Sequence, residues 1–372
     1  MHFARIHISG LRNIESAELA LSPGFNYIYG ANGAGKTAVL EGLHVLARGR
    51  SFRATNLDQV VGRNKDALLI RAEVQKEHST HALGFSRRGS TNEFRVDGLR
   101  GNGFAELAQH VAVQTLLPDS SELIYGSPSE RRRFLDWGLF HVEQGFLQVS
   151  RRYTRTLQQR NAWLKQQDPS VGVEQDPWLE SIGGLALQLS EARQKYVNRL
   201  RFPFQEALAS LTSHVDIDIE YDWGGLQDSA ETAKKLSESF ARDVKFGSTH
   251  RGPHRADLTV INRHSKEDST SFDKAQNVLS RGQAKIVASA LMLAQVEVQR
   301  AESGEGSVVL IDDFGAELDE EHWHKFVRAL ERLGCQVIST STEPPVAQTW
   351  LHEVECDVFH VEHGAVVSEK ND

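Results

Sequence analysis

The feature that most constrains this chain is a glycine-rich segment near its N-terminus, GANGAGKT at residues 30–37. A short aromatic and β-branched run precedes it at residues 25–29, and a stretch with helical character follows at residues 38–46. Strand, glycine-rich loop and helix are the context that the G-x-x-x-x-G-K-[ST] motif requires, because its glycines let backbone N–H groups point at phosphate oxygens. The alternative is a strand–helix turn with a chance Lys-Thr pair, and the flanking pattern disfavours it.

This motif assigns a role to each residue type. Lys36 is placed to reach the β- and γ-phosphates of ATP, which also makes it a candidate catalytic residue, and the Thr37 hydroxyl is a candidate Mg²⁺ ligand. The start of the following helix adds its positive dipole end. The predicted nucleotide-binding residues of the loop are Gly30, Ala31, Asn32, Gly33, Ala34, Gly35, Lys36 and Thr37.

A second acidic segment complements this loop. Residues 307–313 form an apolar run that ends in two carboxylates, which is the Walker B pattern of a buried strand emerging beside the magnesium. We expect Asp312 to hold Mg²⁺, directly or through water, and Asp313 to be the catalytic carboxylate that polarises the attacking water. The alternative is a strand that simply ends in a solvated turn. The phosphate-binding loop upstream disfavours this alternative.

The pentapeptide LSRGQ at residues 279–283 opens a predicted helix over residues 283–300. Ser280 suits an N-cap, and Gly282 permits a ligand to approach the backbone. The segment resembles the ABC-ATPase signature LSGGQ, with Arg281 in place of a glycine, and residues 316–319 follow at the D-loop position. This resemblance implies an ATP-dependent homodimer, in which one subunit completes the site of the other through Ser280, Gly282, Gln283 and Asp319.

The spacing of these motifs narrows the resemblance. Lys36 and Ser280 are 244 residues apart, which is longer than in transporter ATPase subunits, and a modest helical insertion lies between them. Together with the motifs, three further segments resemble the RecF family of small SMC-like proteins. They are IHISGLRNIESAEL at 6–19, GSPSERRRFLD at 126–136 and GPHRADL at 252–258.

The resemblance implies an α/β fold: a P-loop ABC-ATPase head, with a mixed sheet and flanking antiparallel strands, that carries an inserted α-helical arm domain. The expected ATPase domain covers residues 1–118 and 243–372, and the arm covers 119–242. It also implies an ATP-dependent DNA-binding protein of recombinational repair, replication and the SOS response to DNA damage. Such a protein clamps gapped DNA at single-strand/double-strand junctions, is a weak ATPase whose slow hydrolysis is stimulated by DNA, and helps RecR and RecO to load RecA.

Several arginines are candidates for DNA contact. The basic turn after the P-loop helix suits either a solvated helix end or a phosphate contact, and the row at residues 131–133 occupies consecutive helix positions. The row cannot all face one way, so we expect at least one member to pair with an internal carboxylate. Roles for Ser51 and His254 stay open between ligand contact and structure. The candidates are Arg50, Arg53, Arg131, Arg132 and Arg133.

Composition limits the alternatives. Residues 304–372 hold fifteen Asp/Glu against four Lys/Arg, a balance of −11, so the other 303 residues carry +3 of the total −8 (−8 minus −11) and can present basic surface. The chain has only two cysteines, which excludes a disulfide framework and is consistent with the reducing cytoplasm. Its sequence lacks an apolar run of the ~18 residues that a membrane span needs. A transporter-type nucleotide-binding subunit and an ATP-dependent protein scaffold remain as alternative functions.

The sequence pattern of the expected arm, residues 119–242, predicts mostly helices. We expect one long helix from Ser127 to about residue 167 and a second from residue 177, kinked or interrupted at Pro203. Strands are expected at residues 215–219 and 258–261. We expect the intervening segment 245–257, which has two histidines, to be a solvated loop, and the spacing of these histidines is a weak match to any zinc motif.

Overall fold

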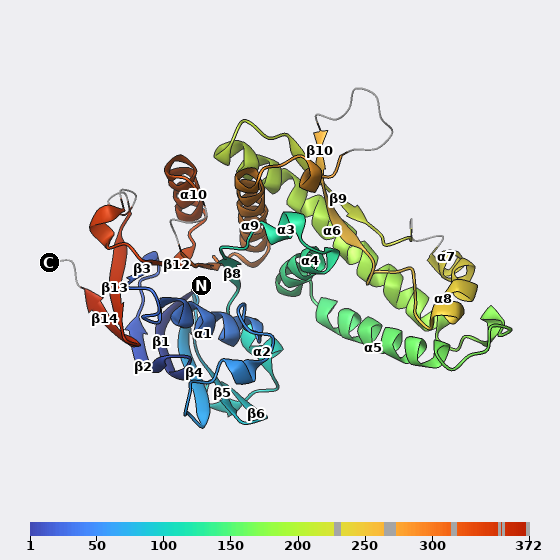
Figure 1. Ribbon diagram of the computed structural model, residues 1–372, viewed down its shortest axis with the longest axis horizontal. Helices are drawn as coiled ribbons and strands as arrows, with labels where there is room; N and C mark the ends of the chain where they lie inside the picture. Colours follow the sequence, from blue (N-terminus) through green and yellow to red (C-terminus); the bar gives the residue numbers. More distant parts are fainter. Residues whose placement is uncertain (227–231, 264–272, 314–317, 349–350, 352–353, 370–372) are drawn as a thin grey trace. The chain divides into compact units, whose positions relative to one another are not determined.

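The computed structural model describes residues 1–226, 232–263, 273–313, 318–348, 351 and 354–369 (Figure 1). By its contacts the chain divides into two compact units. Unit 1 comprises Met1–Ser120, Ser210–Thr212 and Val296–Asp372, and unit 2 comprises Ser121–Ala209 and Ser213–Gln295. The P-loop and the acidic strand therefore belong to unit 1, and the signature-like segment belongs to unit 2.

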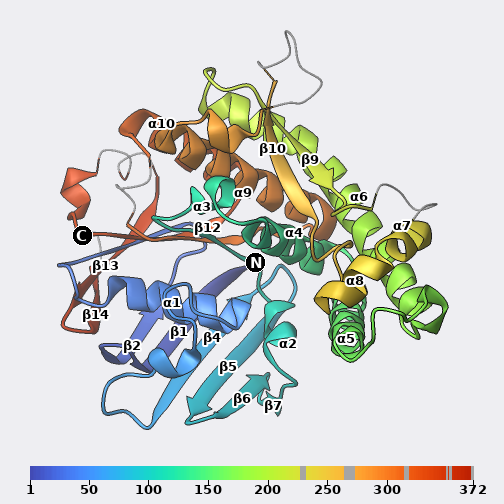
Figure 2. The ribbon, with the colours of Figure 1, turned by 45° about the vertical axis from the view of Figure 1, so that its right-hand side comes forward.

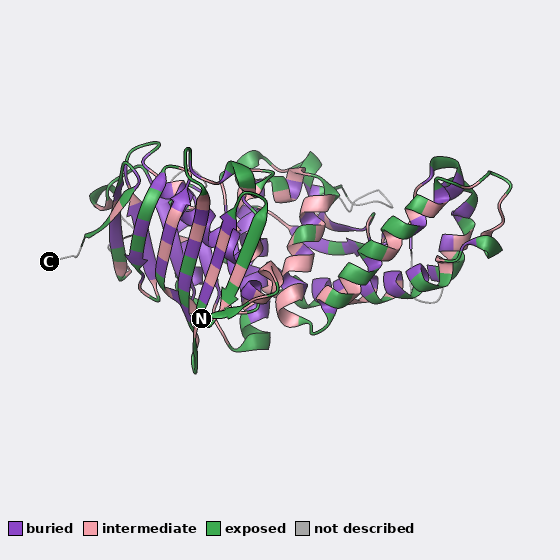
Figure 3. Cartoon of the chain, turned by 90° about the horizontal axis from the view of Figure 1, so that it is seen from below, coloured by how far each residue is buried: buried purple, intermediate pink, exposed green. Residues whose placement is uncertain are grey.

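Unit 1 contains a fully antiparallel sheet of six strands in the order β2-β1-β4-β5-β6-β7. Its strands alternate between buried apolar and exposed polar positions, as expected for a sheet with one solvated face (Figure 3). The tight turn at Asp97 and Gly98 has both residues at positive φ, 51° and 80°. The strands are β1 (His2–Leu11), β2 (Ile14–Ala20), β4 (Ala67–Gln75), β5 (Thr80–Arg88), β6 (Thr91–Val96) and β7 (Leu99–Arg100).

A second six-stranded sheet has the order β14-β13-β3-β12-β11-β8. Five of its strands are parallel, and β14 pairs antiparallel at one edge. Because parallel strands end at one edge of a sheet, the chain segments after β3, β11 and β12 meet there. The strands are β3 (Phe25–Tyr29), β8 (Val113–Leu116), β11 (Val308–Ile311), β12 (Gln336–Ser341), β13 (Cys356–Glu362) and β14 (Ala365–Glu369).

Helix α1 (Lys36–Arg48) lies between these two sheets (Figures 1 and 2). Its buried residues form one continuous core with apolar side chains of both sheets, so the P-loop helix is fixed from two sides. A Cβ atom added to Gly42 would lie 2.8 Å from Ile8 Cδ1, which shows how closely α1 approaches β1. Unit 1 also contains α2 (Phe104–Ala108), α10 (Glu320–Arg332) and the 3-10 turns Leu57–Gln59 and Pro345–Ala347.

Unit 2 is mainly helical, with a two-stranded antiparallel sheet of β9 and β10. Contacts group residues 243–295 with this unit, which differs from the expected domain boundary, because β10 pairs along its length with β9. The elements are α3 (Glu122–Tyr125), α4 (Pro128–Val142), α5 (Phe146–Leu164), the 3-10 turn Val173–Gln175, α6 (Leu179–Leu211), β9 (Ile217–Asp222), α7 (Thr232–Glu238), α8 (Phe240–Phe246), β10 (Asp257–Asn262), the 3-10 turn Ala275–Asn277 and α9 (Arg281–Ser303). The last residues of α6 and of α9 fall in unit 1.

Two helical predictions in unit 2 need correction. The single helix expected over 127–167 is two helices, because Gly145 adopts a left-handed φ of 83° between α4 and α5. The interruption expected at Pro203 does not occur, and α6 continues as one helix to Leu211. Buried neighbours on both sides of the proline, Leu200 and Phe204, hold the helix through tertiary packing.

Candidate nucleotide-binding site and predicted DNA contacts

The glycine-rich loop has the backbone conformation that its sequence predicts. Gly30, Gly33 and Gly35 have φ values of 155°, 78° and 124°, a region that disfavours side chains. A Cβ atom on Gly30 would lie 2.2 Å from the Val361 carbonyl oxygen, whereas one on Gly33 would meet nothing within 4 Å. The loop therefore packs against β13 at its start and leaves open space at its tip.

The side chain of Lys36 folds back over this loop. Its Nζ donates to the carbonyl oxygens of Gly30 at 2.7 Å and Ala31 at 3.0 Å. Burial lowers the pKa of the Lys36 amine, while the nearby carboxylates of Asp312 and Asp313 act to raise it. The N-terminus of α1 has no side-chain cap, so the loop offers a lysine and a helix N-terminus to an anion.

The acidic end of β11 meets the loop through a shared oxygen atom. Asp312 Oδ1 accepts hydrogen bonds from Thr37 Oγ1 and from Thr340 Oγ1, both at 2.8 Å. Asp313 follows with a left-handed φ of 56°, and its backbone N–H donates to Thr340 Oγ1 at 3.0 Å. A hydroxyl beside a carboxylate is the oxygen donor set that Mg²⁺ prefers, so these residues fit a magnesium nucleotide.

Thr340 is a residue of this site to which the sequence analysis gave no role. It is the second-last residue of β12, which pairs in parallel with both β11 and β3. Its hydroxyl joins the two acids by donating to one and accepting from the backbone of the other. The sequence did contain a signal for Thr340, namely a hydroxyl residue near the end of the strand that follows Walker B. Neighbouring parallel strands end at the same edge of the sheet, so such a residue can reach the Walker B acids.

The signature-like segment begins α9, as predicted, two residues earlier than expected. Ser280 N donates to Gln283 Oε1 at 2.9 Å, and Gln283 N donates to Ser280 Oγ at 3.3 Å, which is a reciprocal capping box. Ser280 is exposed, and a Cβ atom on Gly282 would meet nothing within 4 Å. Asp319 caps α10 by accepting from His322 N at 3.0 Å, and residues 316–317 of the predicted D-loop lie outside the described residues.

A buried carboxylate organises the basic turn after α1. Glu41, on α1, accepts two bonds from the Arg12 guanidinium, at 2.8 and 2.7 Å, and one from the Ser51 hydroxyl. The Ser51 oxygen also accepts from the backbone N–H groups of Arg53 and Ala54. Ser51 therefore has a structural role, and the network of Arg12 and Glu41 was missed because its members are distant in sequence.

A family model described as the RecF/RecN/SMC N terminal domain matches residues 2–366. The DNA replication and repair protein RecF of Pseudomonas aeruginosa (strain LESB58) is 37% identical over 372 residues, covering 98% of this chain and 97% of that protein. The chain belongs to the RecF family. The RecF of Pseudomonas putida (strain W619) is 36% identical and covers 98% of each chain.

Solved structures agree with the RecF assignment. The chain is similar to a structure of the recombination mediator protein RecF-ATPrS in the RecFOR pathway, with 25% identity, a TM-score of 0.84 and coverage of 99% of this chain and 98% of that one. An Smc head bound to the C-winged helix domain of ScpA matches in fold, with 13% identity, a TM-score of 0.61 and coverage of 100% and 98%. The expected SMC-like ABC-ATPase head fold is confirmed. Within the described ranges, none of the helices combines the length and apolarity needed to cross a membrane.

The arginine row of this RecF-family chain does not act as one surface. Arg131 is 6% exposed, and its Nε and Nη2 atoms donate to the two Asp257 carboxylate oxygens at 2.7 and 2.9 Å. Its Nη1 donates to the Gly126 carbonyl at 2.8 Å. The expected DNA contact of Arg131 is therefore wrong, because its guanidinium is used inside unit 2, and the expectation that one member pairs with an internal carboxylate is confirmed.

The other candidate arginines lie at the surface to different degrees. Arg132 is partly buried and donates to the Ala256 carbonyl at 2.7 Å, while the half-exposed Arg133 pairs with Glu130 on the same helix. Arg50 and Arg53 are exposed in the turn that Glu41 organises. These four residues remain predictions as DNA contacts.

His254 has a structural role, so the expected solvated loop is wrong for its neighbourhood. Its Nδ1 lies 2.7 Å from the Tyr153 hydroxyl, and its Nε2 lies 2.9 Å from the Thr249 carbonyl. Because a carbonyl can only accept, Nε2 carries the proton and Nδ1 accepts from the tyrosine. Burial lowers the pKa of His254 to about 4, so the ring is neutral at neutral pH.

Proposed function

We propose that this chain is an ATP- and Mg²⁺-dependent DNA-binding ATPase of recombinational repair and replication, working as an ATP-induced homodimer. The observation that carries the proposal is the hydrogen bond between Thr37 and Asp312, which joins the phosphate-binding loop to the acidic strand. Each of these residues is a magnesium ligand type, and Lys36 lies on the same loop. The RecF relatives, described as DNA replication and repair proteins, support the biological setting.

The roles within one protomer follow from the site. The loop residues 30–37 hold the triphosphate, Thr37 and Asp312 hold Mg²⁺, and Lys36 neutralises charge on the transferred phosphate. Asp313 is exposed and its backbone is anchored by Thr340, so its carboxylate can orient and polarise a water molecule. An aspartate reaches less far than a glutamate, which suits slow hydrolysis in a switch.

The proposed dimer uses the start of α9. Ser280, Gly282 and Gln283 of one protomer face the nucleotide held by the other, together with Asp319. The exposure of Ser280 and the open space at Gly282 support this role, because a phosphate could approach the backbone there. Binding ATP across two protomers links dimer closure to the presence of the γ-phosphate.

The proposed DNA contacts are Arg50, Arg53, Arg132 and Arg133. Arginine contacts to phosphates carry no sequence information and weaken with salt, which suits gapped DNA with a single-strand/double-strand junction. The similarity to a recombination mediator of the RecFOR pathway supports RecO and RecR as partners. The proposed role of these partners is to load RecA together with this chain.

Mixing two inactive variants tests the trans arrangement. Lys36→Met removes the phosphate-binding lysine, and Ser280→Arg blocks the signature; neither variant alone should hydrolyse ATP or dimerise with ATP. A mixed dimer has one site in which the intact Lys36 and the intact Ser280 come from different protomers. We therefore expect ATPase activity to reappear on mixing, to about half that of wild-type dimers if all protomers pair as mixed dimers.

The matched control is a mixture of Lys36→Met with the double variant Lys36→Met/Ser280→Arg, which cannot form an intact site and should stay inactive. Light scattering during size-exclusion chromatography measures dimer formation in the same samples. Full activity of Ser280→Arg alone, or no recovery in a mixture that does dimerise, contradicts the trans arrangement.

A further inference from the structure

The solvated face of the antiparallel sheet contains a hollow with a volume of about 400 Å³. Its lining comes from β1, β4, β5 and β6 and the turn at Gly98, so it is separate from the P-loop and from the acidic strand. Arg5, Arg71 and Arg95 line it and are exposed, and Ala82 and Gly84 form its floor. The volume lies in the range of small-molecule sites, about 300–1,000 Å³.

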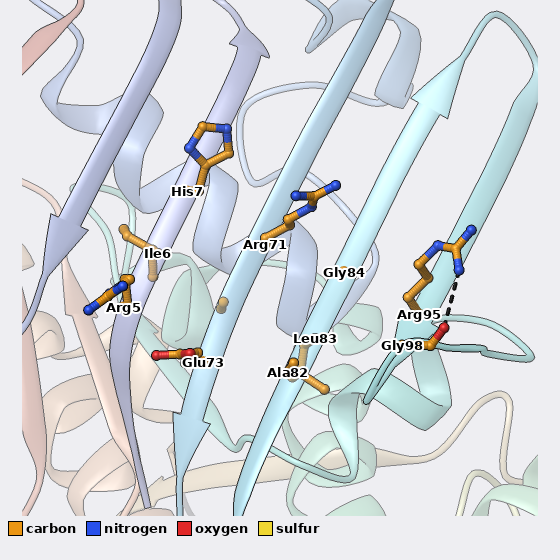
Figure 4. A pocket seen from close by; sticks show the side chains of 11 residues that line it. Arg5, Ile6, His7, Arg71, Glu73, Ala82, Leu83, Gly84, Arg95 and Gly98 are labelled. Atoms are coloured by element: carbon orange, nitrogen blue, oxygen red, sulfur yellow. Dashed lines mark hydrogen bonds between the residues drawn. The ribbon is translucent and has the colours of Figure 1, made fainter.

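The pairing register of the sheet creates this hollow. Arg71 pairs with Gly84, and Gly84 pairs with Arg95, so the three residues lie in one row across β4, β5 and β6. Neighbouring strands are about 4.8 Å apart, which places the two arginine backbones about 10 Å apart. Figure 4 shows Arg71 and Arg95 on either side of Gly84, which has no side chain to fill the space between them.

The row extends in both directions as a largely cationic line. His7 pairs with Arg71 on one side, and Arg100 pairs with Arg95 on the other. The next row carries Arg5 opposite Glu73, the one carboxylate among the lining residues. Three guanidinium groups against one carboxylate give the hollow a formal charge of +2 on a chain of −8.

These guanidinium groups are available for a ligand. The guanidinium groups of Arg5 and Arg71 have no hydrogen bond or ion pair with another described residue, and Arg95 uses one N–H on the Gly98 carbonyl at 3.2 Å. A solvated sheet face accepts polar side chains of either sign, and side chains of like charge in one row repel each other. An anion between them would remove the repulsion and accept several N–H donors.

We propose that this hollow binds the phosphate ester of a nucleotide unit, with its phosphate between Arg71 and Arg95. A phosphate has enough oxygen acceptors for forks from two or three arginines, whereas a carboxylate has two oxygens. The floor of Ala82 and Gly84 and the aliphatic stems of the arginines provide apolar surface for the sugar and base. The ligand is either a free nucleotide or a unit of a nucleic-acid strand, and the inference does not depend on the proposed ATP-driven function.

Two kinds of variant of the full chain separate charge from shape. Arg71→Ala/Arg95→Ala removes the anion-binding groups, while Gly84→Leu fills the hollow and keeps every charge. A Cβ atom on Gly84 would have Arg95 Cβ, at 3.4 Å, as its sole neighbour within 4 Å, so the sheet tolerates the substitution. Arg88→Ala, an exposed arginine at the end of β5 outside the hollow, is the matched control.

The probes are thymidine 5′-monophosphate, measured by calorimetry, and a fluorescein-labelled twelve-residue oligothymidylate, measured by anisotropy. Both are used without ATP, and the Lys36→Met background removes binding at the P-loop. We expect the affinity of at least one probe to be at least about tenfold lower for both hollow variants than for the chain with an intact hollow. The affinity of the same probe for Arg88→Ala should be unchanged. Binding of the mononucleotide identifies a free nucleotide as the ligand, and binding of the oligonucleotide alone identifies a nucleic-acid strand.

Three results would overturn the proposal. One is equal binding of both probes to wild type and to the hollow variants. Another is that neither probe binds at low salt, even at millimolar probe concentration. The third is an oligoglutamate peptide that binds the hollow more tightly than the nucleotide probes, which would make it a site for an acidic protein segment.

Discussion

Thr340 and Asp312 are joined by a hydrogen bond of 2.8 Å, from the threonine hydroxyl to the same carboxylate oxygen that accepts from Thr37. The Thr340 oxygen in turn accepts from the Asp313 backbone N–H. One side chain on β12 therefore fixes both acids that follow β11. Thr340 acts as a positioning residue, because its contacts are with the two acids.

Thr340→Val keeps the shape of the side chain and removes both hydrogen bonds. Because each bond involves a charged or strained partner, we expect ATP hydrolysis to slow about tenfold, while ATP affinity changes less than about threefold. Thr340→Ser restores the hydroxyl and should recover most of the rate. Steady-state hydrolysis and equilibrium ATP binding separate the two effects, and unchanged hydrolysis in Thr340→Val would rule out the positioning role.

The buried pair of Arg131 and Asp257 predicts a stability defect without a DNA-binding defect. Arg131→Ala leaves a carboxylate that is only 10% exposed without its cation, and breaking such a pair costs about 3–5 kcal/mol. Arg133→Ala, two positions along the same helix, removes an exposed pair and should cost about 0–1 kcal/mol. Urea unfolding followed by tryptophan fluorescence measures both variants, and equal costs would contradict the structural assignment.

His254 predicts a stability loss in acid. The folded state holds the ring neutral with a pKa of about 4, against an ordinary value of 6.5, so the unfolded chain binds the proton first as the pH falls. Stability from this group is therefore complete above pH 6.5 and declines between pH 6.5 and 4, by about 2 kcal/mol between pH 7 and pH 5. His254→Gln cannot take up this proton.

Unfolding free energies of wild type and His254→Gln at pH 7 and pH 5 test this account. His44 also has a pKa well below its ordinary value because of burial, but it contributes equally to both proteins. The wild-type loss should exceed the variant's by about 2 kcal/mol. Parallel pH profiles would mean that the His254 ring is not held neutral by the folded chain.

The buried Glu41 predicts a coupling between the P-loop helix and the basic turn. Arg12→Ala removes the charged partner of a side chain that is 0% exposed, whereas Ser51→Ala removes only a hydroxyl contact. We expect Arg12→Ala to destabilise by about 3–5 kcal/mol and Ser51→Ala by about 1–3 kcal/mol. Limited proteolysis within residues 50–56 should accelerate in both variants, and an unchanged cleavage rate would contradict the coupling.

The parts of the site that local sequence encodes could be predicted. Gly30, Lys36 and Thr37 belong to one continuous loop, and Asp312 directly follows an apolar strand. The parts that could not be predicted depend on residues brought together by the fold. Asp257 is 126 positions from Arg131, and Thr340 is 28 from Asp312.

The same contrast explains the errors in the fold. Helical periodicity continued through residues 143–145, but the extended backbone at Glu143 and the left-handed conformation at Gly145 separate α4 from α5. Pro203 carries a strong local signal against a helix, but packing around α6 outweighs it. Assigning roles to the arginines at residues 131–133 requires knowing which face of α4 is buried. Short-range sequence patterns do not contain this information.

The central claim is that ATP bound between two protomers controls DNA binding. The most direct measurement is the affinity for a gapped duplex with ATP and with ADP, for wild type, Lys36→Met and Ser280→Arg, at two salt concentrations. The account predicts tight, salt-sensitive binding for wild type with ATP alone, lost in both variants. Equal binding of wild type with ATP and with ADP, or full binding by Lys36→Met, would contradict it.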